Sequence, residues 1–387
     1  MAIGNGVKIV VASDSFKGCL SSAAVADAVA RGIRRVSPSA TVVKVPVADG
    51  GEGTVEALTV ARGGVTVSAR AHDPLMRAIT AAYGVLPDGT AVIEMAAASG
   101  LPLLTAAERN PLVTSSAGTG ELVADALRRG CRRFIIGLGG SATNDGGAGM
   151  LRALGVEFSD ADGARLPEGG AALARLSAID LSGLDARLAD CELLVACDVT
   201  NPLCGARGAS AVYGPQKGAT PLMVTQLDAA LARYALTARR LLGRDIAELP
   251  GAGAAGGLGA ALLGFLNAEL RSGIDLIVSE AGLREKLAGA DLLITGEGRL
   301  DAQSRNGKAA YGILRAGRAA GVPVAAIVGQ LDADRDEVLR DGFAAVCSLR
   351  ELAASSADSL ARAAELLELA AERVFFSPPR HKDTKFD

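Results

Sequence analysis

The sequence has no tryptophan and few other aromatic residues, with eight Phe and four Tyr among 387 residues. Proteins that bind single-stranded nucleic acid stack bases on aromatic side chains, so this composition argues against that function. The charge is nearly balanced, with 40 basic and 43 acidic residues, and lacks the positive excess that attracts nucleic acid or an anionic membrane. A small molecule is therefore the expected partner.

Cysteine and histidine are also scarce. The six Cys lie far apart without a CxxC pair, and there are only two His, so we expect neither a zinc site nor a disulfide framework. The apolar run Ile9–Ala12 near the N-terminus is too short for the core of a signal peptide. These features favour a protein of the reducing cytoplasm.

One long stretch has no charged residue, Leu249–Ala268, and it contains a GxxxG pair at Gly253 and Gly257. Such pairs occur in membrane-spanning helices. Here the stretch begins with Leu-Pro, is rich in Gly and Ala, and has acidic flanks. We therefore expect a Gly-rich loop that enters a helix of a soluble protein.

The order of predicted elements indicates an α/β fold. Residues 7–12 and 41–47 are apolar runs typical of buried strands, and Ser21-Ser22 between them is expected to cap a helix. Residues 64–95 instead contain short strands separated by turns, which predicts antiparallel sheet. Later, Pro221–Leu242 is predicted as a helix capped by Thr220.

The last third of the chain again alternates strands and helices. We therefore predict a doubly wound Rossmann-like domain formed by residues 1–63 and 288–380, with a second, mixed α/β domain, residues 64–287, inserted into it. Residues 381–387 are expected to form a frayed tail.

Five loops combine glycine with Asp or Lys beside a predicted strand end or helix start. They are Ser13–Gly18, Asp49–Thr54, Gly137–Gly147, Cys197–Gly205 and Gly296–Asp301. Glycines let backbone N–H groups approach a phosphate, and nearby carboxylates can hold a divalent cation against it. An ordinary turn is the alternative for each loop, but the set together favours phosphoryl transfer.

Three lysines, Lys17, Lys217 and Lys308, stand in or beside such loops, where an ammonium group could reach a phosphate. A solvated surface lysine is the alternative for each of them.

The common nucleotide-binding signatures are missing or weak. No GxxxxGK[ST] motif is present, which excludes a P-loop enzyme. Gly251–Gly256 fits GxGxxG but follows Leu-Pro rather than a strand, so an NAD-dependent dehydrogenase is disfavoured. Gly137–Ala142 is similar to the phosphate loop of the galactokinase and homoserine kinase superfamily, which gives a rival kinase prediction.

Several short segments, spread over nearly the whole chain, match one known family. They are SDSFKG (13–18), ADGGEGT (48–54), AVIEMAAASGL (91–101), NPL (110–112), GTGEL (118–122), GGSATNDGG (139–147), CDVTNPLCG (197–205), GPQKGATP (214–221), GAGAAGGLG (251–259) and TGEGRLD (295–301). In these segments the chain resembles the bacterial glycerate kinases of the type that phosphorylates the 2-hydroxyl. All five loops chosen on physical grounds fall inside them.

The resemblance implies an ATP-dependent kinase that uses Mg²⁺ and converts D-glycerate to 2-phosphoglycerate and ADP. Two alternatives stay open: a small-molecule kinase of the galactokinase and homoserine kinase type, and a non-catalytic α/β protein that binds a metabolite. Whether the protein forms a homo-oligomer is also open.

Our hypothesis for the site assigns roles to residues of these loops. Asp198 and Asp301 are the leading candidates for binding Mg²⁺ or accepting the hydroxyl proton, with Asp49 and Asp145 as second choices for catalysis and metal binding. The residues expected to bind glycerate or the transferred phosphoryl group are Ser15, Lys17 and Arg299. The residues expected around the nucleotide are Gly139, Gly140, Ser141, Thr143, Asn144, Gly256 and Gly257.

Overall fold

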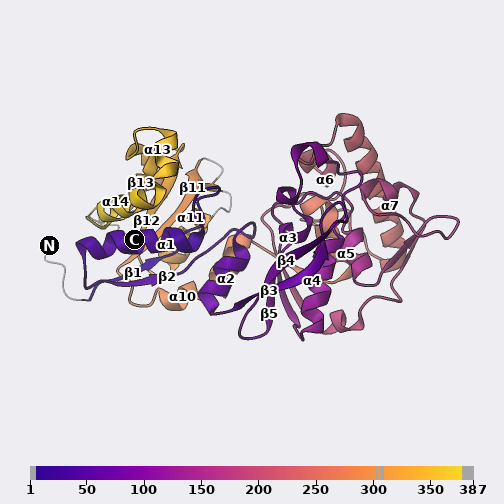
Figure 1. Cartoon of the computed structure of the whole chain (residues 1–387), viewed down its shortest axis with the longest axis horizontal. Helices are drawn as coiled ribbons and strands as arrows, with labels where there is room; N and C mark the ends of the chain where they lie inside the picture. Colours follow the sequence, from indigo (N-terminus) through magenta and orange to yellow (C-terminus); the bar gives the residue numbers. More distant parts are fainter. Residues whose placement is uncertain (1–5, 302–303, 306–308, 377–387) are drawn as a thin grey trace, which may run out of the picture. The chain divides into compact units, whose positions relative to one another are not determined.

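A computed structural model describes residues 6–301, 304–305 and 309–376, and Figure 1 labels many of its helices and strands. The chain forms two compact units. Unit 1 comprises Met1–Asp49, Glu56–Arg62 and Ile274–Asp387, and unit 2 comprises Gly50–Val55 and Gly63–Gly273. The segment that contains α9 (Gly273–Glu280) and α10 (Leu283–Lys286) thus falls almost wholly in unit 1, whereas the sequence-based boundary at 287/288 assigned it to the inserted domain. The expected tail, 381–387, lies outside the described residues.

Unit 1 is built on a parallel five-stranded sheet with the order β13-β12-β11-β1-β2. Its strands are β1 (Lys8–Val11), β2 (Thr41–Lys44), β11 (Leu292–Leu300), β12 (Val324–Leu331) and β13 (Ala345–Ser348). Counted along the chain within the unit, the order is 2-1-3-4-5, which is a doubly wound arrangement whose direction reverses between β1 and β11. The predicted α/β fold class is confirmed.

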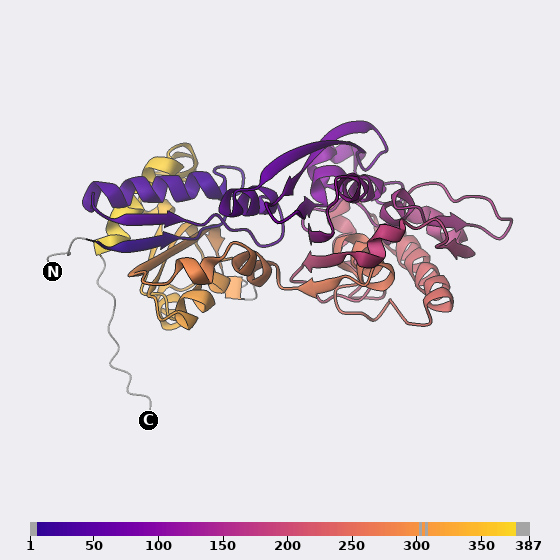
Figure 2. The same ribbon diagram turned by 90° about the horizontal axis from the view of Figure 1, so that it is seen from below.

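Helices cover both faces of this sheet. Besides α9 and α10 they are α1 (Ser22–Val36), α2 (Thr54–Arg62), α11 (Ala309–Ala319), α12 (Arg335–Arg340), α13 (Ser356–Ala361) and α14 (Ala363–Phe376). Ile294 packs with α1 and α14, whereas the adjacent Leu293 points to the opposite face, toward Gly317 of α11. Figure 2 shows the indigo α1 along one side of the strands and orange helices along the other.

The start of α1 agrees with the sequence. The hydroxyl of Ser21 accepts the N–H of Ala24 at 3.4 Å, which confirms the predicted cap. Val25, Val29 and Ile33 are buried in the core of unit 1, at the spacing expected of one helix face.

Unit 2 contains a mixed six-stranded sheet with the order β10-β9-β6-β5-β4-β3. Its strands are β3 (Val65–His72), β4 (Ala78–Val85), β5 (Thr90–Glu94), β6 (Arg133–Gly137), β9 (Glu192–Ala196) and β10 (Glu269–Arg271), and β7 (Glu157–Ser159) pairs separately with β8 (Ala178–Asp180). Strands β3, β4 and β5 are antiparallel neighbours, as predicted for residues 64–95, and β5, β6, β9 and β10 run parallel.

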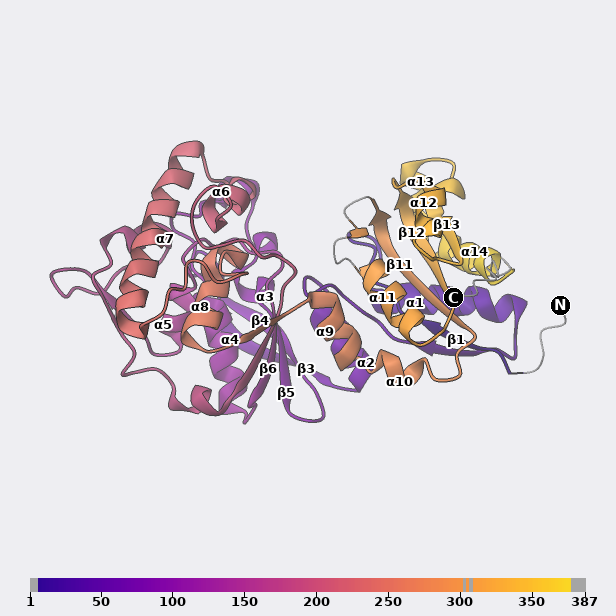
Figure 3. The same ribbon diagram turned by 180° about the vertical axis from the view of Figure 1, so that it is seen from behind.

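The helices of unit 2 are α3 (Ala96–Ser99), α4 (Ala117–Arg128), α5 (Ala148–Ala153), α6 (Ala209–Tyr213), α7 (Pro221–Leu242) and α8 (Leu258–Phe265). Helix α7 has the predicted bounds, and Thr220 accepts the N–H of Met223 as its cap. Figure 3 shows α7 beside α8, and Tyr234 stacks on Phe265 between them with ring centroids 5.9 Å apart.

The uncharged stretch Leu249–Ala268 is a glycine-rich turn that leads into α8, as the sequence predicted. Within the described residues, no helix has both the length and the apolar character needed to cross a bilayer.

Candidate active site

Asp14 follows β1 at the point where the strand order of unit 1 reverses. Its backbone N–H donates to Gly296 O of β11 at 2.9 Å, so the two central strands hold it in place. Its side chain is buried, and Oδ1 accepts the N–H of Ser15 at 2.6 Å. Open α/β sheets bind ligands outside the strand ends at such a reversal, so Asp14 stands where a ligand is expected.

Burial raises the pKa of Asp14 from 3.8 to about 7, and the negative charge of Asp49 acts in the same direction. A carboxyl group with a pKa near 7 can accept a proton at neutral pH. Asp14 lies inside a candidate loop, but the sequence-based hypothesis gave it no role. The signal that could have identified it is its position two residues after the buried run Ile9–Ala12.

Three of the predicted site residues lie close to Asp14. Ser15 and Lys17 belong to the same loop as Asp14, and Asp49 belongs to the loop that follows β2. Lys17 Nζ is 3.9 Å from Asp49 Oδ2, and the lysine side chain is 61% exposed and therefore accessible to a ligand. Ser15 is half-buried and follows Asp14 directly. Unit 1 thus combines one ammonium group, two carboxyl groups and a hydroxyl at its carboxyl edge.

The end of β11 carries two further predicted residues. Arg299 is exposed, and its Nη2 lies 2.5 Å from Asp332 Oδ2. Asp301 Oδ1 accepts the N–H and the hydroxyl of Ser304, at 3.0 and 3.2 Å. Lys308 lies outside the described residues.

A small cavity opens beside Lys17. It has a volume of about 170 Å³, and its lining includes the polar Lys17, Gln330 and Arg350 and the apolar Phe16, Leu349 and Leu360. Pockets for drug-sized ligands occupy roughly 300–1,000 Å³, so this cavity suits a molecule of a few carbon atoms and not a nucleotide.

The glycine-rich loop Gly137–Gly147 follows β6 in unit 2. Gly140 is exposed with φ 74°, and Gly139 is half-buried. A Cβ on Gly139 would lie 2.7 Å from Gly51 Cα, so only glycine permits this close approach of two loops. The backbone groups of Gly139 and Gly140 are therefore accessible to a ligand. The next residue, Ser141, is buried, with 6% of its surface exposed.

Asp145, at the other end of this loop, is fully buried. Its Oδ2 accepts the N–H and the hydroxyl of Ser116, each at 2.8 Å, and its Oδ1 accepts the N–H of Gly147 at 3.1 Å. Burial raises the pKa of this carboxyl group above its usual range, and the hydrogen bonds oppose that rise. These contacts make Asp145 an internal support of the loop.

Four of the residues expected around the nucleotide lie inside unit 2. Thr143 and Asn144 are 0% exposed. Gly256 and Gly257 belong to the 3₁₀ turn η6 (Ala254–Gly257), and a Cβ on Gly256 would lie 2.0 Å from Thr143 O. Gly146 N–H also donates to Gly256 O at 3.0 Å. Because they are buried against other residues of unit 2, they shape the loop from within.

Asp198 follows β9, which pairs in parallel with β6. It is exposed, and its Oδ1 accepts the N–H of Gly273 at 3.0 Å. Because the carboxyl ends of parallel neighbours meet at one edge, Asp198 lies on the same edge of the sheet as the Gly137–Gly147 loop.

Two of the candidate carboxylates, Asp198 and Asp145, differ in whether a Mg²⁺ ion could reach them. No three His, Cys, Asp or Glu side chains of the described chain are grouped closely enough to form a metal site by themselves. Kinase-type Mg²⁺ is held by one or two carboxylates and by the phosphates of the nucleotide. An exposed Asp198 meets this requirement, whereas both oxygens of the buried Asp145 already accept hydrogen bonds from the protein.

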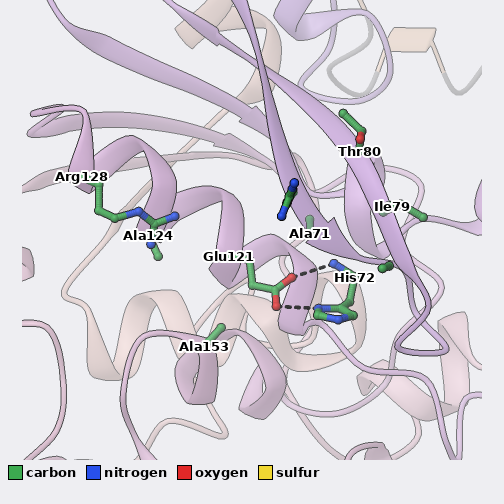
Figure 4. Close-up of a pocket in the computed structure, with 10 residues that line it drawn as sticks. Ala71, His72, Ile79, Thr80, Glu121, Ala124, Arg128 and Ala153 are labelled. Atoms are coloured by element: carbon green, nitrogen blue, oxygen red, sulfur yellow. Dashed lines mark hydrogen bonds and ion pairs between the residues drawn. The ribbon is translucent and has the colours of Figure 1, made fainter.

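A larger groove of about 650 Å³ lies elsewhere in unit 2, between β3, β4, α4 and α5 (Figure 4). Glu121 accepts the backbone N–H of His72 there, and its other oxygen lies 2.7 Å from His72 Nδ1. Arg128, on the same wall, pairs with Asp125 at 3.2 Å. These charged groups are paired with one another, and the predicted site residues lie on other loops.

Glycine-rich and acidic loops at the carboxyl ends of parallel strands define the chain as an α/β enzyme of the kind that acts on phosphorylated ligands. The glycerate kinase family model matches residues 9–377, and the chain belongs to that family. This membership confirms the resemblance and favours it over the galactokinase and homoserine kinase alternative.

Individual relatives agree with the family. The chain is 51% identical to the glycerate 2-kinase of Escherichia coli K12 over 344 residues, covering 89% of this chain and 90% of that protein. It is 47% identical to the glycerate kinase of Bacillus subtilis 168 over 369 residues, covering 95% and 97%. A crystal structure of a candidate glycerate kinase 2 from Salmonella typhimurium LT2 matches with a TM-score of 0.86 and 48% identity, covering 96% and 97% of the two chains.

Proposed function

We propose that this chain transfers the γ-phosphoryl group of ATP to the 2-hydroxyl of D-glycerate, giving 2-phosphoglycerate and ADP. The observation that carries this function is the 51% identity, over 90% of its length, to a protein named glycerate 2-kinase. We also propose that the reaction takes place in the cytoplasm, since all six cysteines are free thiols.

We assign the nucleotide to unit 2. Gly139 and Gly140 are proposed to face its phosphates, because they are the accessible part of the glycine-rich loop, and the buried Ser141 next to them is proposed to support them. Thr143, Asn144, Gly256 and Gly257 act behind them by fixing the loop, as their burial suggests.

We assign the acceptor to unit 1. The cavity beside Lys17 has a volume suited to a three-carbon acid, and Lys17 is the one residue of the predicted site, among those that the structure describes, that lines it. Lys17 and Ser15 are proposed to bind the glycerate carboxylate, and Arg299 to neutralise charge on the transferred group.

In the reaction, the 2-hydroxyl oxygen forms a bond to the γ-phosphorus while the bond from that phosphorus to the β,γ-bridging oxygen breaks, and ADP leaves. The hydroxyl proton must pass to a base. Asp14 is the strongest candidate, because its pKa of about 7 suits proton transfer at neutral pH. Asp49, whose negative charge raises that pKa, is proposed to maintain it, and Asp301 remains the second candidate for the base.

Mg²⁺ would neutralise charge on the phosphates of bound ATP. Asp198 is the residue proposed to hold it in unit 2, and Asp301 is the corresponding carboxylate in unit 1. Asp145 is assigned to the loop instead, since its oxygens accept hydrogen bonds from Ser116 and Gly147.

A coupled ADP-release assay with D-glycerate, ATP and Mg²⁺ tests this function, and we expect turnover that depends on all three. The ³¹P–¹H coupling pattern of the product distinguishes 2-phosphoglycerate from the 3-isomer. Binding of glycerate without ADP release would favour a non-catalytic metabolite-binding protein. A change in nicotinamide absorbance with a hydroxy acid would favour a dehydrogenase.

A further inference from the structure

Lys217 is one of the largest fully buried side chains of the protein, with 1% of its surface exposed. It ends the 3₁₀ turn η5 (Pro215–Lys217), which follows α6. A surface lysine was the alternative considered from the sequence, and its burial rules that out. A buried ammonium group is costly unless other groups compensate it, so its contacts should reveal its role.

Its ammonium group donates a hydrogen bond to Thr143 O at 2.6 Å, across 74 residues of sequence. Thr143 in turn contacts Ser141, because its N–H donates to Ser141 Oγ at 3.2 Å and the two hydroxyl oxygens lie 3.3 Å apart. A continuous chain of polar contacts therefore leads from the buried Lys217 to the buried Ser141, which is the neighbour of the exposed Gly140.

Helix α6, which precedes η5, makes a second contact with the Gly137–Gly147 loop, at Asn144. Asn144 Nδ2 donates to Ser210 Oγ of α6 at 3.0 Å. The loop is also closely packed against Gly256, whose Cβ, if present, would overlap Thr143 O. Thr143 and Asn144 are thus held by Lys217, by Ser210 and by the close packing of η6.

The positive charge of Lys217 is attracted by the negative charge of Asp145. Asp145, two residues beyond Thr143, interacts with it electrostatically, and this attraction opposes the effect of burial, which lowers the pKa of Lys217 to about 7. An apolar side chain of the same length could fill the space without that cost. The ammonium group therefore provides directional contact with the loop in addition to packing.

We propose that Lys217 is a positioning residue for the nucleotide: through Thr143 it fixes Ser141 and the adjacent glycines in the conformation that receives the phosphates. This inference rests on the proposed assignment of the loop to the nucleotide, and it adds a residue that does not itself touch the ligand.

The test compares Lys217→Met with wild type. Methionine replaces the four-carbon stem of lysine with an apolar chain of similar volume, lacks the terminal ammonium group and removes the hydrogen bond to Thr143. We expect the Kd for ADP·Mg²⁺, measured by calorimetry, to rise at least tenfold, the KM for glycerate to change less than twofold, and Tm to stay within a few degrees.

Lys286→Met is the matched control. Lys286 also donates to backbone carbonyls, Ala281 O at 2.6 Å and Ala61 O at 3.2 Å, but it lies in unit 1. Its replacement should leave the Kd for ADP·Mg²⁺ unchanged.

Ser210→Ala keeps the test informative if Lys217→Met does not fold. It removes the smaller contact to Asn144, and we expect a Kd increase of about threefold. A folded Lys217→Met protein with wild-type nucleotide affinity, or a loss confined to glycerate binding, would overturn the proposal. If wild type binds ADP but does not phosphorylate glycerate, the proposed function fails while the effect of Lys217 on nucleotide binding can still be measured.

Discussion

Asp14 combines burial with a position at the central strand end of unit 1, and its ionisation should control the reaction. Because a base acts in its deprotonated form, we predict that kcat/KM for glycerate falls as pH drops below about 7. In Asp14→Asn this inflection should disappear, with kcat reduced at least about 100-fold. A pH–rate profile of both proteins from pH 5 to 9 measures this.

Ionisation of the Asp14 carboxyl group should affect stability in the opposite direction from activity, because the protonated form stabilises the fold. The folded pKa lies above the unfolded value, so the stabilisation from proton binding is complete below about pH 4 and is lost as the pH rises through about 7. Asp14→Asn should therefore unfold at pH 8 at a Tm no lower than that of wild type. A lower Tm at pH 8 together with an unchanged rate profile would remove Asp14 as the base.

Lys17 is an exposed cation beside Asp49 in unit 1, and its loss should weaken binding of the acid substrate. We predict that Lys17→Met raises the KM for glycerate at least tenfold, because a charge-assisted hydrogen bond is lost, and changes the KM for ATP less than twofold. Lys44→Met is the control, since Lys44 is also exposed and pairs with Asp27 at 2.5 Å. An equal rise in both KM values for Lys17→Met would contradict the assignment.

Asp198 tests the metal assignment in unit 2. We predict that Asp198→Asn lowers kcat at least about 100-fold and raises the Mg²⁺ concentration needed for half-maximal rate. Asp160→Asn is the control, because Asp160 likewise accepts a backbone N–H, that of Ala164 at 2.9 Å, in an exposed turn. A near-normal kcat for Asp198→Asn would exclude Asp198 from the site.

At the scale of elements, the turn η6 and the Gly137–Gly147 loop form one packed assembly. Gly256 has φ 70° and no room for a Cβ. We predict that Gly256→Ala lowers the free energy of unfolding by more than the roughly 1–2 kcal/mol of left-handed strain alone and raises the Kd for ADP.

Gly243→Ala separates strain from overlap. Gly243 has φ 68° at the end of α7, but a Cβ there would meet no atom within 4 Å. Denaturant unfolding of the two variants should give the larger loss for Gly256→Ala, and only that variant should bind ADP more weakly. Equal losses would show that the close contact with Thr143 does not matter.

At the scale of the whole molecule, each unit has its own hydrophobic core. The core around Val29 and Leu366 lies in unit 1, and the core around Phe134 and Tyr234 lies in unit 2. We predict that calorimetry gives a larger unfolding enthalpy than the van't Hoff value, because the units need not unfold together. ADP should raise the Tm of the transition in which unit 2 unfolds, and glycerate should raise the Tm of the transition in which unit 1 unfolds. A single two-state transition that responds equally to both ligands would contradict this prediction.

Much of the architecture follows from local patterns. The cap at Ser21, the bounds of α7 and the antiparallel strands of residues 64–95 are confirmed, because each depends on residues close together in sequence. The candidate loops are likewise local, since glycine and aspartate beside an apolar run mark a strand end. The roles of the residues inside those loops stay predictions.

The sequence by itself determined the α/β class, several of the helices and strands, and the loops that carry the candidate residues. Only the tertiary structure decided that Asp14 and Lys217 are buried, that Asp145 is bound to Ser116 and that Asp198 is exposed. The physical reason is that burial and pKa depend on groups brought together from distant parts of the chain. Thr143 and Lys217, 74 residues apart and in hydrogen-bond contact, are the clearest example.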